Sequence, residues 1–289
     1  MTSFNSIAEL IQEARESACS VSQVVIHWEM ENNQLSEGRQ REIMLKNWHV
    51  MEEALERGMK NTEKSLSGLT GGDALKLYAY RQHGYTGEAV LSTAASAMGV
   101  SEVNAVMGRI VACPTAGSCG IVPAALYAAA MQRGSRTEEI VDALFTAAGI
   151  GMVVEANASI AGAYGGCQAE CGTAAGMAAA ALVQLAGGSP EMIGNAVALA
   201  MKNLLGLACD PVAGLVEVPC VKRNGFIAVH AMLAADMAMA GVKSVIPADE
   251  VIDAMDRIGR AMPSSIKETA EGGLAATKTG RELAKKLFR

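Results

Sequence analysis

The sequence of 289 residues predicts an all-α fold, in which many helices pack together and Gly-rich turns lie at helix N-termini around the functional site. Three observations predict this fold. Apolar side chains recur at helical spacing, beginning with Ile7, Leu10, Ile11 and Ala14. Long Ala-rich segments alternate with short Gly-rich turns, and alternating β-branched patterns are rare. Aromatic residues make up only 4% of the chain, whereas 30 Gly and 17 Met favour close helix packing with flexible gap-filling side chains.

The expected elements follow in chain order. Residues 1–65 are polar and helical, and Trp28 and Trp48 mark a second and a third helix. After Lys64, apolar helices follow Gly-rich turns at 67–73, 114–120 and 162–167. Those later helices are expected at 74–82, 121–133, 169–186, 190–207 and 225–240. An α/β fold is the alternative, because 152–154 and 212–218 could form short strands.

The whole chain, 1–289, is expected to be one domain, in which the helical segment 1–65 packs on a core of residues 66–289. No change of composition marks a boundary after residue 65.

Composition and charge exclude several classes of protein. The net charge is −6 and no basic stretch is present, so a nucleic-acid partner is not expected. The longest apolar stretches, such as 225–241 with His230 and Asp236, do not reach ~18 uncharged apolar residues, so no membrane span is expected. The N-terminus lacks a basic region followed by an apolar core, which indicates a cytoplasmic chain without a signal peptide. Seven cysteines in such a chain indicate free thiols, metal ligands or core packing rather than disulfides.

Three of these cysteines occupy positions that suit metal binding. Cys167 lies between a Gly-rich turn and a helix, and Cys220 lies just before another helix. Helix N-termini carry partial positive charge, which favours the thiolate that binds metal. Cys209 is expected to end a helix, and the stiff loop from Cys209 to Cys220 could bring both sulfurs to one point. The spacing matches neither a zinc site nor a ferredoxin, so it leaves both a thiolate site and simple packing open.

The Gly-rich turns at 70–73 and 114–118 precede helices and could bind a carboxylate through free backbone N–H groups, although such turns are often only helix caps. Asp73 could be an N-cap, and Lys76 could pair with it or face a ligand. Asn157 could line the site or be a satisfied core amide, and the charge of Lys222 could stabilise a carboxylate or be solvated. The candidate binding residues are therefore Thr70, Gly71, Gly72, Asp73, Lys76, Thr115, Ala116, Gly117, Ser118, Asn157 and Lys222.

Several segments resemble the α subunit of iron–sulfur-dependent bacterial L-serine dehydratases. The resemblance rests on the segments 165–170 (GGCQAE), 207–220 (LACDPVAGLVEVPC), 68–73, 104–120 and 272–275. It implies that Cys167, Cys209 and Cys220 hold a [4Fe–4S] cluster, one iron of which has no protein thiolate. That iron would act as a Lewis acid on the β-hydroxyl of L-serine, which is converted to pyruvate and ammonia. The core 66–289 would then be catalytic.

The resemblance also bears on the remaining residues. Cys171, four residues after Cys167, could be a fourth ligand, but it matches no ligand position of the family and is expected in the core. Cys113 and Cys19 are also expected to pack, whereas Cys119 could line the pocket. Ala270 stands where the family has Gly, which argues against a left-handed turn there. Four alternatives remain open: L-serine dehydration, a hydro-lyase for another β-hydroxy acid, a pyridoxal-phosphate enzyme, which the missing α/β pattern disfavours, and a non-catalytic helical scaffold.

A general base is not evident in this sequence. His230 lies on an apolar helix, where a histidine is more often a satisfied core residue. In the family, a separate β region carries a Ser-Ser-His-Thr motif, which is absent here. We therefore expect a β-subunit partner, a hetero-oligomer, and little activity of this chain alone.

Overall fold

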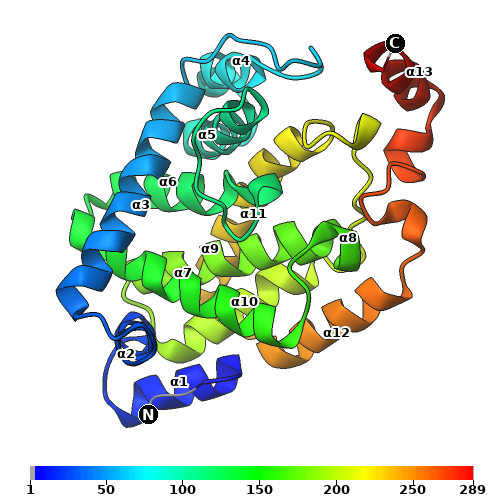
Figure 1. The fold of residues 1–289 in the computed structure, drawn as a ribbon. Helices are drawn as coiled ribbons and strands as arrows, with labels where there is room; N and C mark the ends of the chain where they lie inside the picture. Colours follow the sequence, from blue (N-terminus) through cyan, green and yellow to red (C-terminus); the bar gives the residue numbers. More distant parts are fainter. Residues whose placement is uncertain (1–3, 289) are drawn as a thin grey trace.

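The computed structural model describes residues 4–288 and confirms the all-α prediction (Figure 1). Within those residues there are thirteen α-helices, several short 3₁₀ turns and no β-strand. The segment Met152 to Val154 lies inside a long helix, and Val212–Gly214 is a 3₁₀ turn, so the α/β alternative is wrong. The nearest approach to a sheet is a single isolated parallel bridge between Cys209 and Lys267.

The helices run in order as α1 Ile7–Glu16, α2 Val21–Asn33, α3 Glu37–Gly58, α4 Asp73–Tyr80, α5 Glu88–Ala105, α6 Ile121–Arg133, α7 Thr137–Asn157, α8 Gly162–Gly165, α9 Thr173–Leu185, α10 Pro190–Lys202, α11 Cys220–Met239, α12 Ala248–Ala261 and α13 Lys278–Leu287. The 3₁₀ turns are η1 Arg81–His83, η2 Ala116–Ser118, η4 Val212–Gly214, η5 Ser264–Ile266 and η6 Gly273–Ala276, and η3 Gln168–Gly172 is a π-helical turn. Among residues 4–288, no helix combines the length and hydrophobicity needed to cross a lipid bilayer.

The first three helices begin at serine N-caps and share the main hydrophobic core with the rest of the chain. The hydroxyls of Ser6, Ser20 and Ser36 each accept a backbone N–H of the following helix, which satisfies a donor that would otherwise be free. Trp48 of α3 is buried in the same core as α7 and α9. Arg41 of α3 also forms an ion pair with Asp142 of α7 at 2.7 Å.

Helix α9 is the centre of the fold. It is Ala-rich, nearly all of it is buried, and it packs against α6, α7, α10 and α11 (Figure 1). Small side chains along α9 allow these four helices to approach it closely. The buried start of α9 follows Cys167 by one π-helical turn, so the core fixes the position of that cysteine.

Glycine lets α3 and α5 approach each other. A Cβ added at Gly58 would lie 2.3 Å from the carbonyl carbon of Gly99, which no side chain tolerates. We expect Gly58→Ala to lower the free energy of unfolding by about 1–3 kcal/mol, because the two backbones would have to separate. Urea denaturation measures this change. Gly38→Ala on the same helix is the control: its Cβ meets nothing within 4 Å, and stability should be unchanged or higher.

Three expected helix boundaries are wrong, and each has a physical cause. The N-cap of α4 is Gly72, not Asp73, because the carboxylate of Glu102, distant in sequence, accepts the first backbone N–H groups of the helix. Helix α11 begins at Cys220 rather than near 225, since Arg223 and Asn224 of its first turns donate to the carbonyls of Ala208 and Gly117 in neighbouring loops. Helix α10 ends at Lys202, so Cys209 does not end a helix and instead forms the bridge to Lys267.

Ala270 corrects one further expectation. It has a φ of 57° and is therefore in the left-handed conformation, although it is not glycine. Glu268, two residues earlier, has a φ of 65°. The surrounding turn is held by backbone bonds, such as Glu268 N to Cys209 O at 2.8 Å, which offset the strain of a side chain there.

Candidate active site

Two of the three predicted cluster cysteines meet in the structure, together with a third thiol that the sequence assigned to the core. The Sγ atoms of Cys167 and Cys171 lie 3.4 Å apart. The thiol of Cys209 also interacts with Cys167, although it comes from a distant loop. All three are buried. The π-helical turn Gln168–Gly172 and the bridge at Lys267 hold these sulfurs at one place.

Cys167 has the environment of a thiolate. Hydrogen bonds with the thiols of Cys171 and then Cys209 hold the pKa of Cys167 well below its usual value, and the positive charge of the Arg223 guanidinium contributes to this shift. The hydrogen bond with Cys167, followed by burial and the negative charge of Cys167, raises the pKa of Cys171 and of Cys209. Thiolate is the form that binds iron, so this charge arrangement fits a metal ligand.

Cys220 is the first residue of α11, one turn before Arg223. Burial and, to a smaller extent, the negative charge of Cys167 raise the pKa of its thiol to about 12. Arg223 donates to the carbonyl of Ala208 at 2.8 Å and pairs with Asp210 at 3.0 Å. It thereby ties the loop that carries Cys209 to the helix that carries Cys220.

Arg223 should therefore be important for stability. Arg223→Met leaves the buried carboxylate of Asp210, which is 5% exposed, without its cation. We expect the free energy of unfolding to fall by about 3 kcal/mol, the usual cost of breaking a buried ion pair from one side. Chemical denaturation measures it. Arg257→Met, which removes an exposed pair on α12, is the matched control and should change little.

Glu170 lies at the centre of this group, and the sequence analysis assigned it no role. Its Oε1 accepts the hydroxyl of Thr115 at 2.8 Å, and its Oε2 lies 3.9 Å from the sulfur of Cys209. A Cβ at Gly162 would lie 2.7 Å from this carboxylate, so glycine makes room for it. Burial raises the pKa of Glu170 to about 7. The available signal was that Glu170 is the lone charged residue between Glu155 and Glu191.

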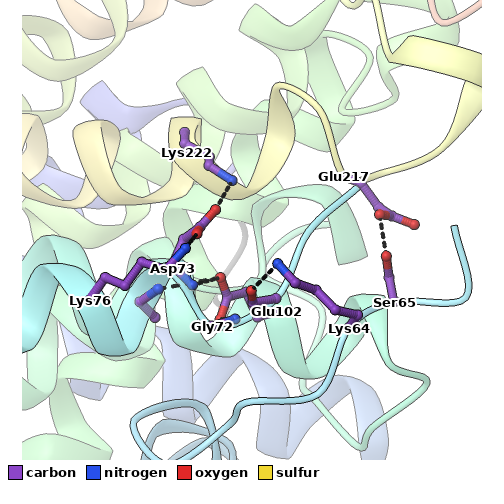
Figure 2. A network of polar contacts seen from close by, with 10 residues as sticks. Lys64, Ser65, Gly72, Asp73, Lys76, Glu102, Glu217 and Lys222 are labelled. Atoms are coloured by element: carbon purple, nitrogen blue, oxygen red, sulfur yellow. Dashed lines mark hydrogen bonds and ion pairs between the residues drawn. The ribbon is translucent and has the colours of Figure 1, made fainter. Parts of the chain in front are cut away.

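The turn before α4 does not offer the free N–H groups that were expected. The buried carboxylate of Glu102, on α5, accepts the backbone N–H groups of Gly72 at 3.0 Å, Asp73 at 2.8 Å and Ala74 at 3.3 Å (Figure 2). Each is a donor that a substrate carboxylate would have needed. Thr70 is different: its hydroxyl is buried, and among the described residues it has no hydrogen-bond partner.

The side chains around that turn form an ion network (Figure 2). Asp73 pairs with Lys222 of α11 at 2.6 Å and with Lys76 at 2.8 Å, so Lys76 does pair with Asp73. Both lysines donate to its carboxylate, Lys222 most strongly, and lower the pKa of Asp73 to about 2. The Lys222 side chain is 41% exposed and retains donors for a ligand.

The second Gly-rich turn is fixed to α11. Asn224 donates to the carbonyl of Gly117 at 2.8 Å and accepts the N–H of Gly120 at 2.9 Å. Ser118 is buried and donates to the carbonyl of Cys113 at 3.0 Å, so its hydroxyl serves the turn itself. Thr115 reaches Glu170, and Ala116 is exposed beside it.

Asn157 has a different neighbourhood. It is exposed, so it is not a core amide, and it donates to the carbonyls of Asn5 and Val153. It lines a cavity of about 710 Å³ together with Tyr164, Arg260 and Lys267.

The remaining cysteines pack in hydrophobic surroundings. Cys119, a candidate for the pocket, is completely buried in a small cluster between α3, α5, α6 and α11. Cys113 belongs to the main core, and Cys19 packs against it.

The donor chemistry of the site fits an iron–sulfur cluster. Within residues 4–288, no three His, Cys, Asp or Glu side chains are already arranged as a metal site. The thiols nevertheless gather around a stabilised thiolate with a cation beside it, which are the ligands and the charge balance that iron–sulfur clusters use. A hard-cation site would instead need several oxygen ligands.

Comparison with known proteins extends these findings. The family model described as "Serine dehydratase alpha chain" matches residues 16–275. The chain is 52% identical over 287 residues to a Bacillus subtilis protein named "Probable L-serine dehydratase, alpha chain", covering 99% of this chain and 95% of the relative. It is 40% identical over 281 residues to the "L-serine dehydratase, alpha chain" of Peptoniphilus asaccharolyticus, covering 96% of each. It is 42% identical over 275 residues to the "L-serine dehydratase" of Streptomyces coelicolor, covering 92% of this chain and 59% of the relative.

Proposed function

The chain belongs to the serine dehydratase alpha chain family, and on this basis we propose that it is the cluster-bearing subunit of an enzyme that converts L-serine to pyruvate and ammonia. The observation that carries the proposal is the grouping of Cys167, Cys171 and Cys209 beside Arg223. Cys209 and Arg223 come from segments remote in sequence from Cys167 and Cys171, and the fold brings them together with a positive charge beside the thiols.

Cys167, Cys209 and Cys220 would hold a [4Fe–4S] cluster, and Cys171 would remain a neighbouring thiol. When bound, such a cluster supplies a Lewis-acidic iron for the β-hydroxyl of serine. Arg223 would balance part of its negative charge, as it does for the thiolate of Cys167.

The remaining side chains offer complementary charges to serine. Glu102 occupies the N–H groups of the first turn, so we assign the serine carboxylate to the ammonium of Lys222, which Asp73 holds in place. We assign the serine ammonium to the carboxylate of Glu170, which Thr115 orients. The hydroxyl of Thr70 and the backbone of 71–72 and 116–118 would form the walls of this site, with Ser118 fixing the second turn.

One experiment tests the proposal directly. The protein is purified anaerobically, iron and sulfide are measured, and dehydration of L-serine and of other β-hydroxy acids is assayed with the partner chain present. We expect about four irons per chain, brown colour and turnover of L-serine above the others. Turnover of a different β-hydroxy acid would indicate another hydro-lyase. An iron-free protein after reconstitution would indicate the helical scaffold and contradict the proposal.

The partner is part of the proposal. Relatives of similar length are named alpha chain, and the Streptomyces coelicolor relative is longer, since this chain covers 59% of it. We propose that a β subunit binds this chain in a hetero-oligomer and completes the active site.

A further inference from the structure

A buried carboxylate holds the chain just before Cys220. Glu217, three residues before this cysteine, is 7% exposed. Its Oε2 accepts two hydroxyls, from Ser65 at 2.6 Å and from Ser67 at 2.7 Å (Figure 2 shows the first). No cation of the described residues is paired with it, so these hydroxyls supply its side-chain hydrogen bonds. A buried carboxylate is costly without such donors, so the contact fixes both segments.

A second contact holds the chain just after Cys220. Lys222, two residues beyond it, pairs with Asp73 at 2.6 Å. Ser65, Ser67 and Asp73 all belong to one stretch of chain that runs from the loop after α3 to the first residue of α4, which we call the strap (residues 64–73). The strap therefore binds the Cys220 segment on both sides of the cysteine (Figure 2).

The strap is itself held rigid. Lys64 donates to the carbonyl of Gly71 at 2.7 Å, and Ser65 N donates to Thr70 O at 3.1 Å. Glu102 fixes its end by accepting the N–H groups of Gly72 and Asp73. Gly71 has a φ of 125°, and a Cβ there would lie 2.1 Å from the carbonyl oxygen of Glu63. The strap is thus anchored to α5, independently of the cysteine segment.

We infer that the strap positions Cys220, with Glu217 and its two serines as positioning residues rather than substrate contacts. The inference rests on the proposed function only in assigning Cys220 as a cluster ligand. Cys209 is held by the bridge at Lys267, and Arg223 ties its loop to the first turn of α11, whereas the loop that leads into Cys220 is held by the strap through Glu217. Loosening the strap should therefore release one ligand selectively.

The test compares Glu217→Ala, the double variant Ser65→Ala/Ser67→Ala, and Glu217→Gln. In cluster-free protein, hydrogen–deuterium exchange of residues 212–222 should be about tenfold faster in the first two variants, because a buried acceptor loses its donors or is removed. Glu217→Gln keeps an acceptor oxygen and should remain close to wild type. In loaded protein, release of iron to a chelator should follow the same order.

Ser92→Ala is the control, since this serine of α5 lines a different cavity. Exchange around Cys167, in residues 166–172, should stay unchanged in every variant, which separates positioning from general destabilisation. Wild-type exchange of 212–222 in both the Glu217→Ala and the double-serine variant would overturn the inference. A wild-type protein that binds no iron would contradict the proposed function, but the exchange measurement would still decide whether the strap holds this segment.

Discussion

Cys167→Ser is expected to abolish cluster binding and to lower turnover of L-serine by well over about 100-fold, more than the loss of a group that only supports a ligand. Serine has almost the same size, but its hydroxyl does not ionise near neutral pH and is a poor ligand for iron. The hydrogen bonds with Cys171 and Cys209 and the charge of Arg223 also lower the pKa of Cys167, which favours the form that binds iron. Iron content, visible absorption and the serine assay measure the effect.

The same result is expected for Cys209→Ser and Cys220→Ser, and two other substitutions serve as controls. Cys113→Ala lies in the main hydrophobic core and should retain iron and activity. Cys171→Ser is the sharper control, because its sulfur is 3.4 Å from that of Cys167. Retention of the cluster in Cys171→Ser supports the three-ligand assignment. Loss of the cluster in Cys171→Ser, or its retention in Cys167→Ser, would contradict that assignment.

Helix type was predictable from the sequence because it depends on local spacing. The 13 residues of α6, Ile121–Arg133, match the expected range, since a Gly-rich turn precedes them and Gly134 follows in the left-handed conformation. The start of α11 was not predictable, because its first polar residues looked solvated. Their partners, such as the carbonyl of Ala208, lie in another part of the chain.

The meeting of Cys167 and Cys209 was not predictable from spacing. They are far apart in sequence, and the contact depends on the loop after α10 and on the bridge to Lys267. Only the resemblance to a family indicated a shared site. For Cys171, the spacing of four residues from Cys167 was visible in the sequence. The π-helical turn that brings the two sulfurs together was not predictable from that spacing.

Carboxylates account for most of what the sequence analysis missed. Glu102 lies within an ordinary-looking helix, and nothing local indicates that it caps α4 across a separation of about thirty residues. Because Glu102 already occupies these backbone N–H groups, the group proposed to bind the substrate carboxylate is Lys222 and not the turn. Glu170 did carry a signal, because a single charge in a long apolar stretch is costly unless it has partners or a function.

The proposed partner chain should have the second large effect. None of the four histidines is a candidate base in the described structure: His27, His49 and His83 are exposed, and His230 bonds to the carbonyl of Ala200 at 2.8 Å. A positioned general base contributes about 100-fold or more to the rate. We therefore expect serine turnover by the loaded chain alone to be at least about 100-fold below that of the complex with the β subunit.

This prediction concerns the reaction and not the cluster. Iron content and visible absorption of the loaded chain should be the same with and without the partner, because Cys167, Cys209 and Cys220 all belong to this chain. Titrating the β subunit into loaded protein and measuring pyruvate formation tests it, and turnover should rise with added β subunit until it saturates. Full turnover by the chain alone would show that the base lies within it, and Glu170, beside the thiols, would then be the first residue to replace.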